Sequence, residues 1–199
     1  MTNNLRSSEV FFKADERNPT IKPKSKRLQV GFKRLSDSAV IPTKAHASDS
    51  GFDLVASEDV IIEPGETAVI PTGIVIELPA GYEAQVRPRS GVTAKTKLRV
   101  QLGTIDNGFT GGIGVIVDNI MAVDEDDRND FYSEVITIEG DLTFIDGRKP
   151  YGSHIIRKGE RIAQLVVQPL PDVEAIEVFD VEESERGSGG FGSTGVSSE

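Results

Sequence analysis

The chain has 199 residues, 37% of them hydrophobic, and a formal net charge of −10 at pH 7. This length allows one domain with its own core plus appended segments. The sequence has no cysteine, which excludes disulfides and thiolate metal sites, and no apolar run approaches the roughly 18–20 residues of a membrane helix. With no secretion signal at the start, we expect a cytoplasmic protein.

The first 27 residues are polar, and the charge of the chain is uneven. Residues 1–35 hold nine Lys or Arg against three Asp or Glu, a local charge of +6, which leaves −16 for the remainder. Such a segment is typical of a mobile arm that solubilises the chain or touches nucleic acid or an acidic partner. The acidic remainder argues against a nucleic-acid groove as the main function, but a phosphate ligand needs only a few Arg side chains and backbone amides.

From Leu28 onward the chain consists of short β-rich runs that end at turn signals. These runs cover residues 28–32, 60–62, 69–70, 74–78 and 82–86. Short strands about 8–12 residues apart predict an all-β domain over 28–183, a barrel or sandwich of the jelly-roll type. We expect no amphipathic helix of three turns before residue 120.

Residues 87–91 place Arg89, Ser90 and Gly91 directly after a predicted strand. Guanidinium, hydroxyl and amide donors at a turn predict a phosphate cradle. Earlier in the chain, residues 48–54 hold Asp49 and Asp53 in a turn-rich setting, and one such carboxylate suffices to hold a hydrated Mg²⁺.

The stretch 103–111 combines one carboxylate, one aromatic ring and three glycines. Asn107 and Gly108 form the dipeptide typical of a two-residue hairpin, so we predict a strand that ends at Ile105 or Asp106 and resumes at Phe109. Asp106 and Phe109 then lie either at a ligand site or on a solvated surface hairpin. Since no Ser–His–Asp setting surrounds either histidine, the chemistry left is an Asp that activates water beside neutralised phosphate.

Residues 118–157 are too long for an ordinary connection and predict a β-rich insert that is functional or faces a partner. Strands are expected over 132–138 and 142–145. The acidic run 124–127 lacks the spacing of a calcium loop, which favours a solvated acidic face.

The core pattern returns with a turn at 158–161 and a strand over 162–167 that carries Gln164. Residues 184–199 then form a Gly-rich arm. It is either a linker or a tail that closes over a ligand, with Phe191 to stack on a ring and Arg186 to grip phosphate.

Five stretches, in order, resemble the five motifs of the homotrimeric dUTPases: residues 47–56, 88–91, 103–111, 159–166 and 186–195. The resemblance covers about residues 28–195, and the insert resembles that of dUTPases from phages of Gram-positive bacteria. It implies hydrolysis of dUTP to dUMP and pyrophosphate with Mg²⁺, in a homotrimer whose active sites are shared between chains. That reaction keeps uracil out of DNA and supplies dUMP for thymidylate synthesis.

The resemblance also implies a role for each matching residue. Asp106 orients and deprotonates the water that attacks the α-phosphate, and Asp53 anchors Mg²⁺ through water. The backbone of Gly103 and Ile105 pairs with uracil, while Phe109 lies under the deoxyribose and excludes a 2′-hydroxyl. Arg89, Ser90 and Gly91 hold the triphosphate, and Gln164 contacts the phosphates or the waters around Mg²⁺. The tail closes last and brings Arg186, Phe191, Gly192 and Ser193 to the ligand.

Two alternatives stay open. Phe109 stands where Tyr is commonest in the family, and Phe also suits the related dCTP deaminases. Those enzymes place a catalytic Glu where Ile116 stands here, and a serine where Gly91 stands, so deamination is disfavoured. The other alternative is a regulatory role in which the insert binds a repressor-type protein.

Overall fold

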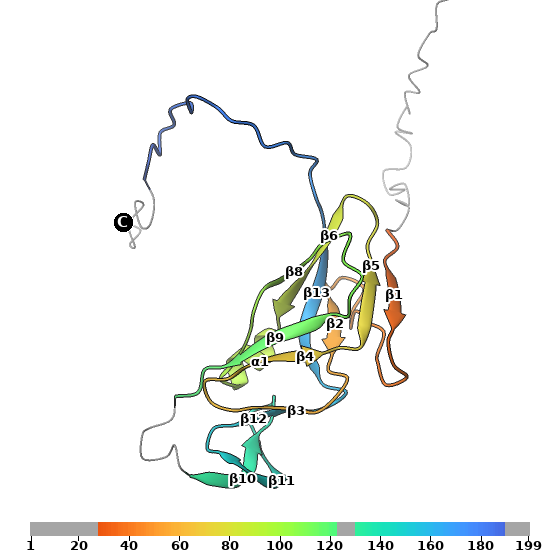
Figure 1. Ribbon diagram of the computed structural model, residues 1–199, viewed down its shortest axis with the longest axis vertical. Coiled ribbons are helices and arrows are strands. Elements are labelled where there is room, and N and C mark those ends of the chain that lie inside the picture. The colour runs from red at the N-terminus through yellow and green to blue at the C-terminus, as the bar shows by residue number, and fades with distance from the viewer. Residues whose placement is uncertain (1–27, 123–129, 190–199) are drawn as a thin grey trace, which may run out of the picture.

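The computed structural model describes residues 28–122 and 130–189 (Figure 1). The expected N-terminal arm, the acidic run at 124–127 and the tail residues Phe191, Gly192 and Ser193 lie outside these ranges. Within them the chain forms thirteen strands and one six-residue helix, so the all-β prediction is confirmed. In the same ranges, no helix is long and apolar enough to cross a membrane.

Three sheets make the body of the molecule. The largest has the strand order β2-β13-β6-β8, with every neighbouring pair antiparallel; its strands are β2 (Phe52–Val55), β13 (Arg161–Pro169), β6 (Tyr82–Pro88) and β8 (Gly103–Ile105). The second has the order β4-β9-β7, with β4 (Thr67–Pro71), β9 (Gly114–Asn119) and β7 (Leu98–Val100). The third pairs β1 (Gly31–Arg34) with β5 (Ile74–Glu77).

The core follows from the two-residue period of the strands. In β9, Val115 and Val117 are fully buried, whereas Ile116 between them is exposed. In the other sheet, Leu54 of β2 and Leu165 of β13 belong to the same buried cluster. One continuous apolar core therefore joins the sheets that carry the predicted motifs.

The insert adds strands to the body, as predicted. β10 (Phe131–Ile136) and β11 (Leu142–Pro150) join β12 (His154–Ile156) and the body strand β3 (Val60–Ile62) in the order β11-β10-β12-β3. This sheet lies at one end of the molecule, away from the tail (Figure 1). The pairing of β10 with β11 shifts between Tyr132 and Glu134, so β11 has a bulge that includes Gly147 at φ +90°.

A buried side-chain amide fastens the insert sheet to the body. Asn119, at the end of β9, is 1% exposed, and its Nδ2 donates to the carbonyls of Ile62 and Gly152 at 3.0 Å each. Its Oδ1 accepts from the backbone N–H of Met121 at 3.0 Å. One side chain thus links β9, β3 and the turn before β12.

The predicted hairpin at Asn107 and Gly108 is wrong. β8 ends at Ile105 and pairs with β6, and the next strand, β9, begins only at Gly114 and pairs with β4 and β7. The Asn107 amide donates to the carbonyls of Leu78 and Pro79, which ties this turn to the β5–β6 connection instead.

The described chain after β13 has neither helix nor strand. Residues 170–189 run away from the body (Figure 1), and Val173, Ile176 and Phe179 are largely exposed. The last strand ends at Pro169, so the expected domain end at residue 183 stays a prediction.

Candidate active site

A polar cavity of about 440 Å³ gathers residues from three of the predicted motifs. The loop at 45–51 and strand β2 supply one wall, Arg89 at the end of β6 another, and β13 the third, with Arg161 and Gln164. Strand pairing explains the meeting, because Gln164 stands opposite Asp53 on one side and Arg87 on the other. The fold thus brings Arg89, Asp53 and Gln164 together around one cavity, and their roles there stay predictions.

Asp53 lies between two guanidinium groups. Its Oδ1 is 3.4 Å from Arg89 Nε, and its Oδ2 is 3.3 Å from Arg161 Nη1. Arg89 also donates from Nη1 to the backbone carbonyl of Arg161 at 2.7 Å. Two independent contacts therefore hold the Arg89 side chain at the cavity wall.

The other acidic candidate, Asp49, has a structural partner. Its carboxylate accepts from the backbone N–H of His46 at 2.7 Å, and its carbonyl accepts from Lys44 Nζ at the same distance. Asp49 therefore closes the loop that forms the cavity wall, which leaves Asp53 as the carboxylate between the arginines.

Sequence reasoning missed two features here. Arg161 is expected only as part of a turn, because nothing near it in the sequence marks it as a partner of Asp53, 108 residues away. Helix α1 (Ser90–Lys95) was not predicted; Arg89 is its N-cap, in extended conformation at φ −93° and ψ 127°. The short helix puts Ser90 and Gly91 in a first turn, where backbone N–H groups have no partner within the helix.

Glu160 precedes Arg161 in the turn that leads into β13. Its carboxylate accepts from the backbone N–H of Arg157 at 2.8 Å. Burial raises the pKa of Glu160 above its ordinary value, and the hydrogen bond and charge of Arg157 oppose that effect. The carboxylate closes this turn and does not line the cavity.

The second group of predicted residues lies along β8. Gly103 is half-buried, Ile105 is buried, and Asp106 is exposed just beyond the end of the strand. The backbone N–H of Phe109 donates to the Asp106 carbonyl at 3.0 Å, which closes a tight turn over residues 106–109. β8 is an edge strand of its sheet, so only one of its edges is paired with strands of the described residues.

One chain does not bring Asp106 and Arg89 together. Ile105 stands opposite Ala84 on β6, and Arg89 lies five residues further on, directly after the end of that strand. At about 3.3 Å per residue this is a separation of about 16 Å, and Asp106 extends it in the opposite direction. Arg186 lies on the exposed segment after β13, where its Nε donates to the Gly189 carbonyl at 3.0 Å.

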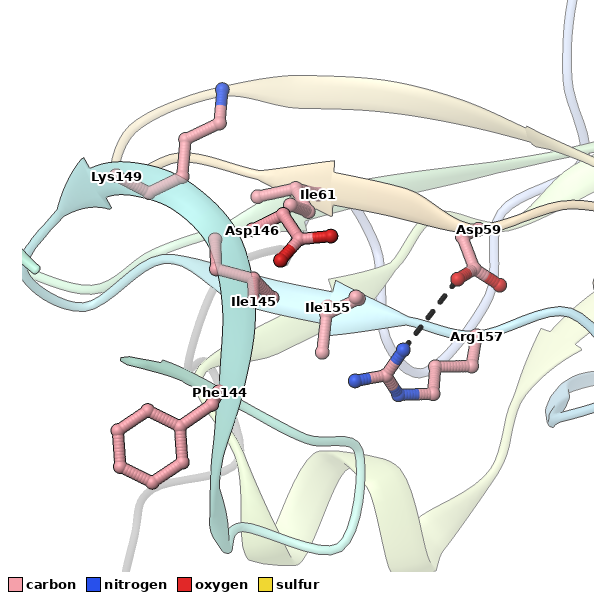
Figure 2. A pocket seen from close by; sticks show the side chains of 8 residues that line it. All are labelled: Asp59, Ile61, Phe144, Ile145, Asp146, Lys149, Ile155 and Arg157. Atoms are coloured by element: carbon pink, nitrogen blue, oxygen red, sulfur yellow. Dashed lines mark ion pairs between the residues drawn. The ribbon is translucent and has the colours of Figure 1, made fainter. Parts of the chain in front are cut away.

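The insert carries a second cavity, of about 680 Å³, at the bulge of β11 (Figure 2). Ile61, Ile145 and Ile155 line it, and Phe144, 74% exposed, stands at its rim. An ion pair between Asp59 and Arg157, 3.6 Å apart, closes one end. None of the predicted catalytic residues lies here, so the cavity belongs to the insert and not to the candidate active site.

Comparison with protein families matches most of the chain to one of them. The family model described as dUTPase matches residues 37–124 and 153–195. The deoxyuridine 5′-triphosphate nucleotidohydrolase of Clostridioides difficile is 42% identical over 165 residues, which are 82% of this chain and 95% of that protein. The protein of the same name from Gloeothece citriformis is 40% identical, over 83% of this chain and 96% of that one.

Solved structures of phage enzymes resemble the fold. A Staphylococcus bacteriophage 80alpha dUTPase with dUpNHpp is 37% identical, with a TM-score of 0.77 over 84% of this chain and 99% of that one. Phage 80alpha dUTPase is also described as controlling the transfer of virulence genes. The dUTPase from phage phi11 of S. aureus is 32% identical, with a TM-score of 0.73 over 78% of this chain and 99% of that one, and is described with a species-specific insert and a structural Mg(II) ion. The family model leaves residues 125–152 unmatched, which is where β10 and β11 lie.

Proposed function

This chain belongs to the dUTPase family, and from that premise we propose how its residues divide the reaction. The chain is a dUTP diphosphatase that hydrolyses dUTP to dUMP and pyrophosphate with Mg²⁺. The match extends over both halves of the body, on either side of the insert, and includes each of the five motif stretches.

We assign the water-activating role to Asp106. Its carboxylate is exposed, and the turn that carries it is held by the Asn107 amide, so the group is both available and fixed. It takes a proton from a water molecule whose oxygen attacks the α-phosphorus, and the bond from that phosphorus to the bridging oxygen breaks to release pyrophosphate. Arg89 neutralises charge that builds on the phosphate oxygens.

The free edge of β8 supports the assignment of uracil recognition to Gly103 and Ile105. An unpaired strand edge presents backbone donors and acceptors, and a pyrimidine edge can complete them. Cytosine presents a different pattern of donors and acceptors and would leave buried groups unpaired, which is a large penalty. Phe109 then lies under the deoxyribose.

The polar cavity fits the triphosphate and its Mg²⁺. Asp53 and Gln164 offer the oxygen ligands that Mg²⁺ prefers, and Arg89, Ser90 and Gly91 offer donors to phosphate. Within the described ranges no group of three or more His, Asp or Glu side chains is placed to hold a metal ion. When bound, the ion would supply positive charge to the phosphates, and Asp53, which also contacts Arg89, would hold it through water.

We propose a homotrimer in which neighbouring chains complete each site. The separation of about 16 Å along β6 supports this, because a site needs Asp106 beside phosphate donors. Val69 and Ile116 support it too, since they face each other across β4 and β9 and remain exposed in the single chain. The tail would close last, with Arg186, Phe191, Gly192 and Ser193 at the ligand. We place this activity in the cytoplasm, that of the host if a phage encodes the chain.

The reaction is tested by pyrophosphate release from dUTP, dTTP, dCTP and UTP, for the wild type and for Asp106→Asn. We expect release from dUTP alone and its loss in the variant. Ammonia release from dCTP would instead support the deaminase alternative, and turnover that persists in the variant would refute the role of Asp106.

Mixed trimers test the sharing of sites. Asp106→Asn and Arg89→Ala chains are each expected to be inactive alone. After unfolding and refolding together in equal amounts, about a quarter of the sites should regain both residues if these come from different chains. If both residues of a site came from one chain, no activity would return.

We propose a second role, the binding of a repressor-type protein by the insert. The observation that favours it is the apolar surface of β10 and β11, where Phe131, Leu142 and Phe144 are exposed. Of these, Phe144 also lines the insert cavity (Figure 2). Deletion of residues 125–152 tests it: hydrolysis should persist while partner binding is lost. Equal partner binding by the deleted and full chains would refute the role.

A further inference from the structure

We infer that Gly111 sets the position of the Phe109 ring, which makes it a positioning residue for discrimination between deoxyribose and ribose. The inference rests on the proposed function, in which the ring lies under the sugar. It concerns a residue to which neither the motif resemblance nor the comparisons give a role.

The observation is a close approach of the ring to the Gly111 backbone. A Cβ atom on residue 111 would lie 2.6 Å from Cζ and 3.0 Å from Cε2 of Phe109. Carbon atoms in contact prefer about 3.5–4.0 Å, so a methyl group there cannot coexist with the ring in its present place. Because no positive φ is recorded at Gly111, alanine suits the backbone and the steric conflict with the ring remains.

The ring moves more easily than the chain around it. On one side, the backbone N–H of Phe109 is bonded to the Asp106 carbonyl at 3.0 Å. On the other, Ile113 donates to the Ile74 carbonyl at 2.8 Å and accepts from the Thr72 hydroxyl at 2.7 Å. The Phe109 side chain is 44% exposed, so its ring can turn into solvent. A methyl group at residue 111 therefore displaces the ring.

The same turn provides a matched control. A Cβ on Gly108 would meet nothing within 4 Å, and no positive φ is recorded there either. Gly108→Ala therefore adds the same methyl group three residues away without touching the ring.

The experiment measures kcat and KM for dUTP and UTP in the wild type, Gly111→Ala, Gly108→Ala, Phe109→Ala and the double variant of positions 109 and 111. We expect Gly111→Ala to lower the dUTP to UTP ratio of kcat/KM by about tenfold or more, and Gly108→Ala to leave it within about twofold. In the double variant the ratio should equal that of Phe109→Ala, because the methyl group no longer meets a ring. An unchanged ratio in Gly111→Ala, or a further fall in the double variant, would overturn the inference.

A second readout separates this inference from the proposed function. The NMR resonances of the Phe109 ring in the ligand-free protein should shift in Gly111→Ala and stay in place in Gly108→Ala. Unshifted resonances in Gly111→Ala would overturn the inference whatever the substrate. Shifted resonances in a protein whose wild type releases no pyrophosphate from dUTP would support the positioning and refute the proposed function alone.

Discussion

Substitution of Asn119 by alanine should destabilise the fold without touching the active-site residues. The change removes three hydrogen bonds, to Ile62, Gly152 and Met121, made by a side chain that is 1% exposed; the Gly152 carbonyl keeps its contact with His154 Nδ1 at 3.1 Å. Each lost bond of this kind costs about 0.5–1.5 kcal/mol, so we expect the free energy of unfolding to fall by about 2–4 kcal/mol. Asn119→Asp should cost at least as much at neutral pH, because a carboxylate cannot donate to either carbonyl.

The assay is urea unfolding followed by circular dichroism at one fixed protein concentration, since assembly makes stability depend on concentration. Gln101→Ala is the control, because its amide bonds to Asp118 on an exposed part of the same sheet. We expect the control to lie within about 0.5 kcal/mol of the wild type. A loss of less than 0.5 kcal/mol in Asn119→Ala, or an equal loss in the control, would refute the view that this amide fastens the insert.

Three further predictions concern single side chains. Burial lowers the pKa of His154 below 6.5, so as the pH falls the imidazole is protonated at a higher pH in the unfolded chain than in the folded chain. The free energy of unfolding should therefore decrease as the pH drops below 6.5. In a pH series of urea midpoints, His154→Gln should flatten this decrease. Gly51→Ala places a methyl group 3.2 Å from Oε1 of Gln164 and should lower kcat/KM for dUTP by about 3- to 10-fold, as measured by pyrophosphate release. Arg161→Ala removes one of the two partners of Asp53 and, because the arginine is 54% exposed, should raise KM for dUTP by only about 2- to 5-fold with kcat retained.

Each of these results has a contrary outcome. An equally steep acid loss of stability in His154→Gln would place the titrating group elsewhere. A wild-type value of kcat/KM in Gly51→Ala would mean that the added methyl group displaces the loop at 45–51 and leaves the Gln164 side chain in place. A large loss of kcat in Arg161→Ala would show that this arginine touches the reacting phosphates and does more than hold Asp53.

Sequence predicted the strands well where the signal was local. The alternation over residues 82–86, which fall in β6, and the turn dipeptides near Pro64 and Pro79 lie within a few residues of the elements that they define. The prediction of a hairpin at Asn107 was wrong because strand pairing is not local. Strand β8 pairs with β6, and the Asn107 amide donates to carbonyls 28 and 29 residues away. Helix α1 has six residues, too few to show a helical period.

The candidate site shows the same limit. Motif order was enough to name Asp53, Arg89 and Gln164, which the fold gathers around one cavity. Arg161 was missed because its partner Asp53 lies 108 residues away and nothing near either residue marks the pair. The contact between Gly111 and the Phe109 ring could not be predicted either. In the sequence, a glycine next to a turn indicates a special backbone conformation and does not show that an aromatic ring packs against it.

The span between the two ends of β6 has a consequence for gene dosage. If a site needs Asp106 from one chain and Arg89 from another, a folded monomer has no dUTP hydrolase activity. Output then depends on encounters between copies, so at low expression it rises more steeply than the number of chains made. A cell in which these chains were few would hold folded protein with little dUTP hydrolysis, and a modest rise in synthesis would switch the activity on.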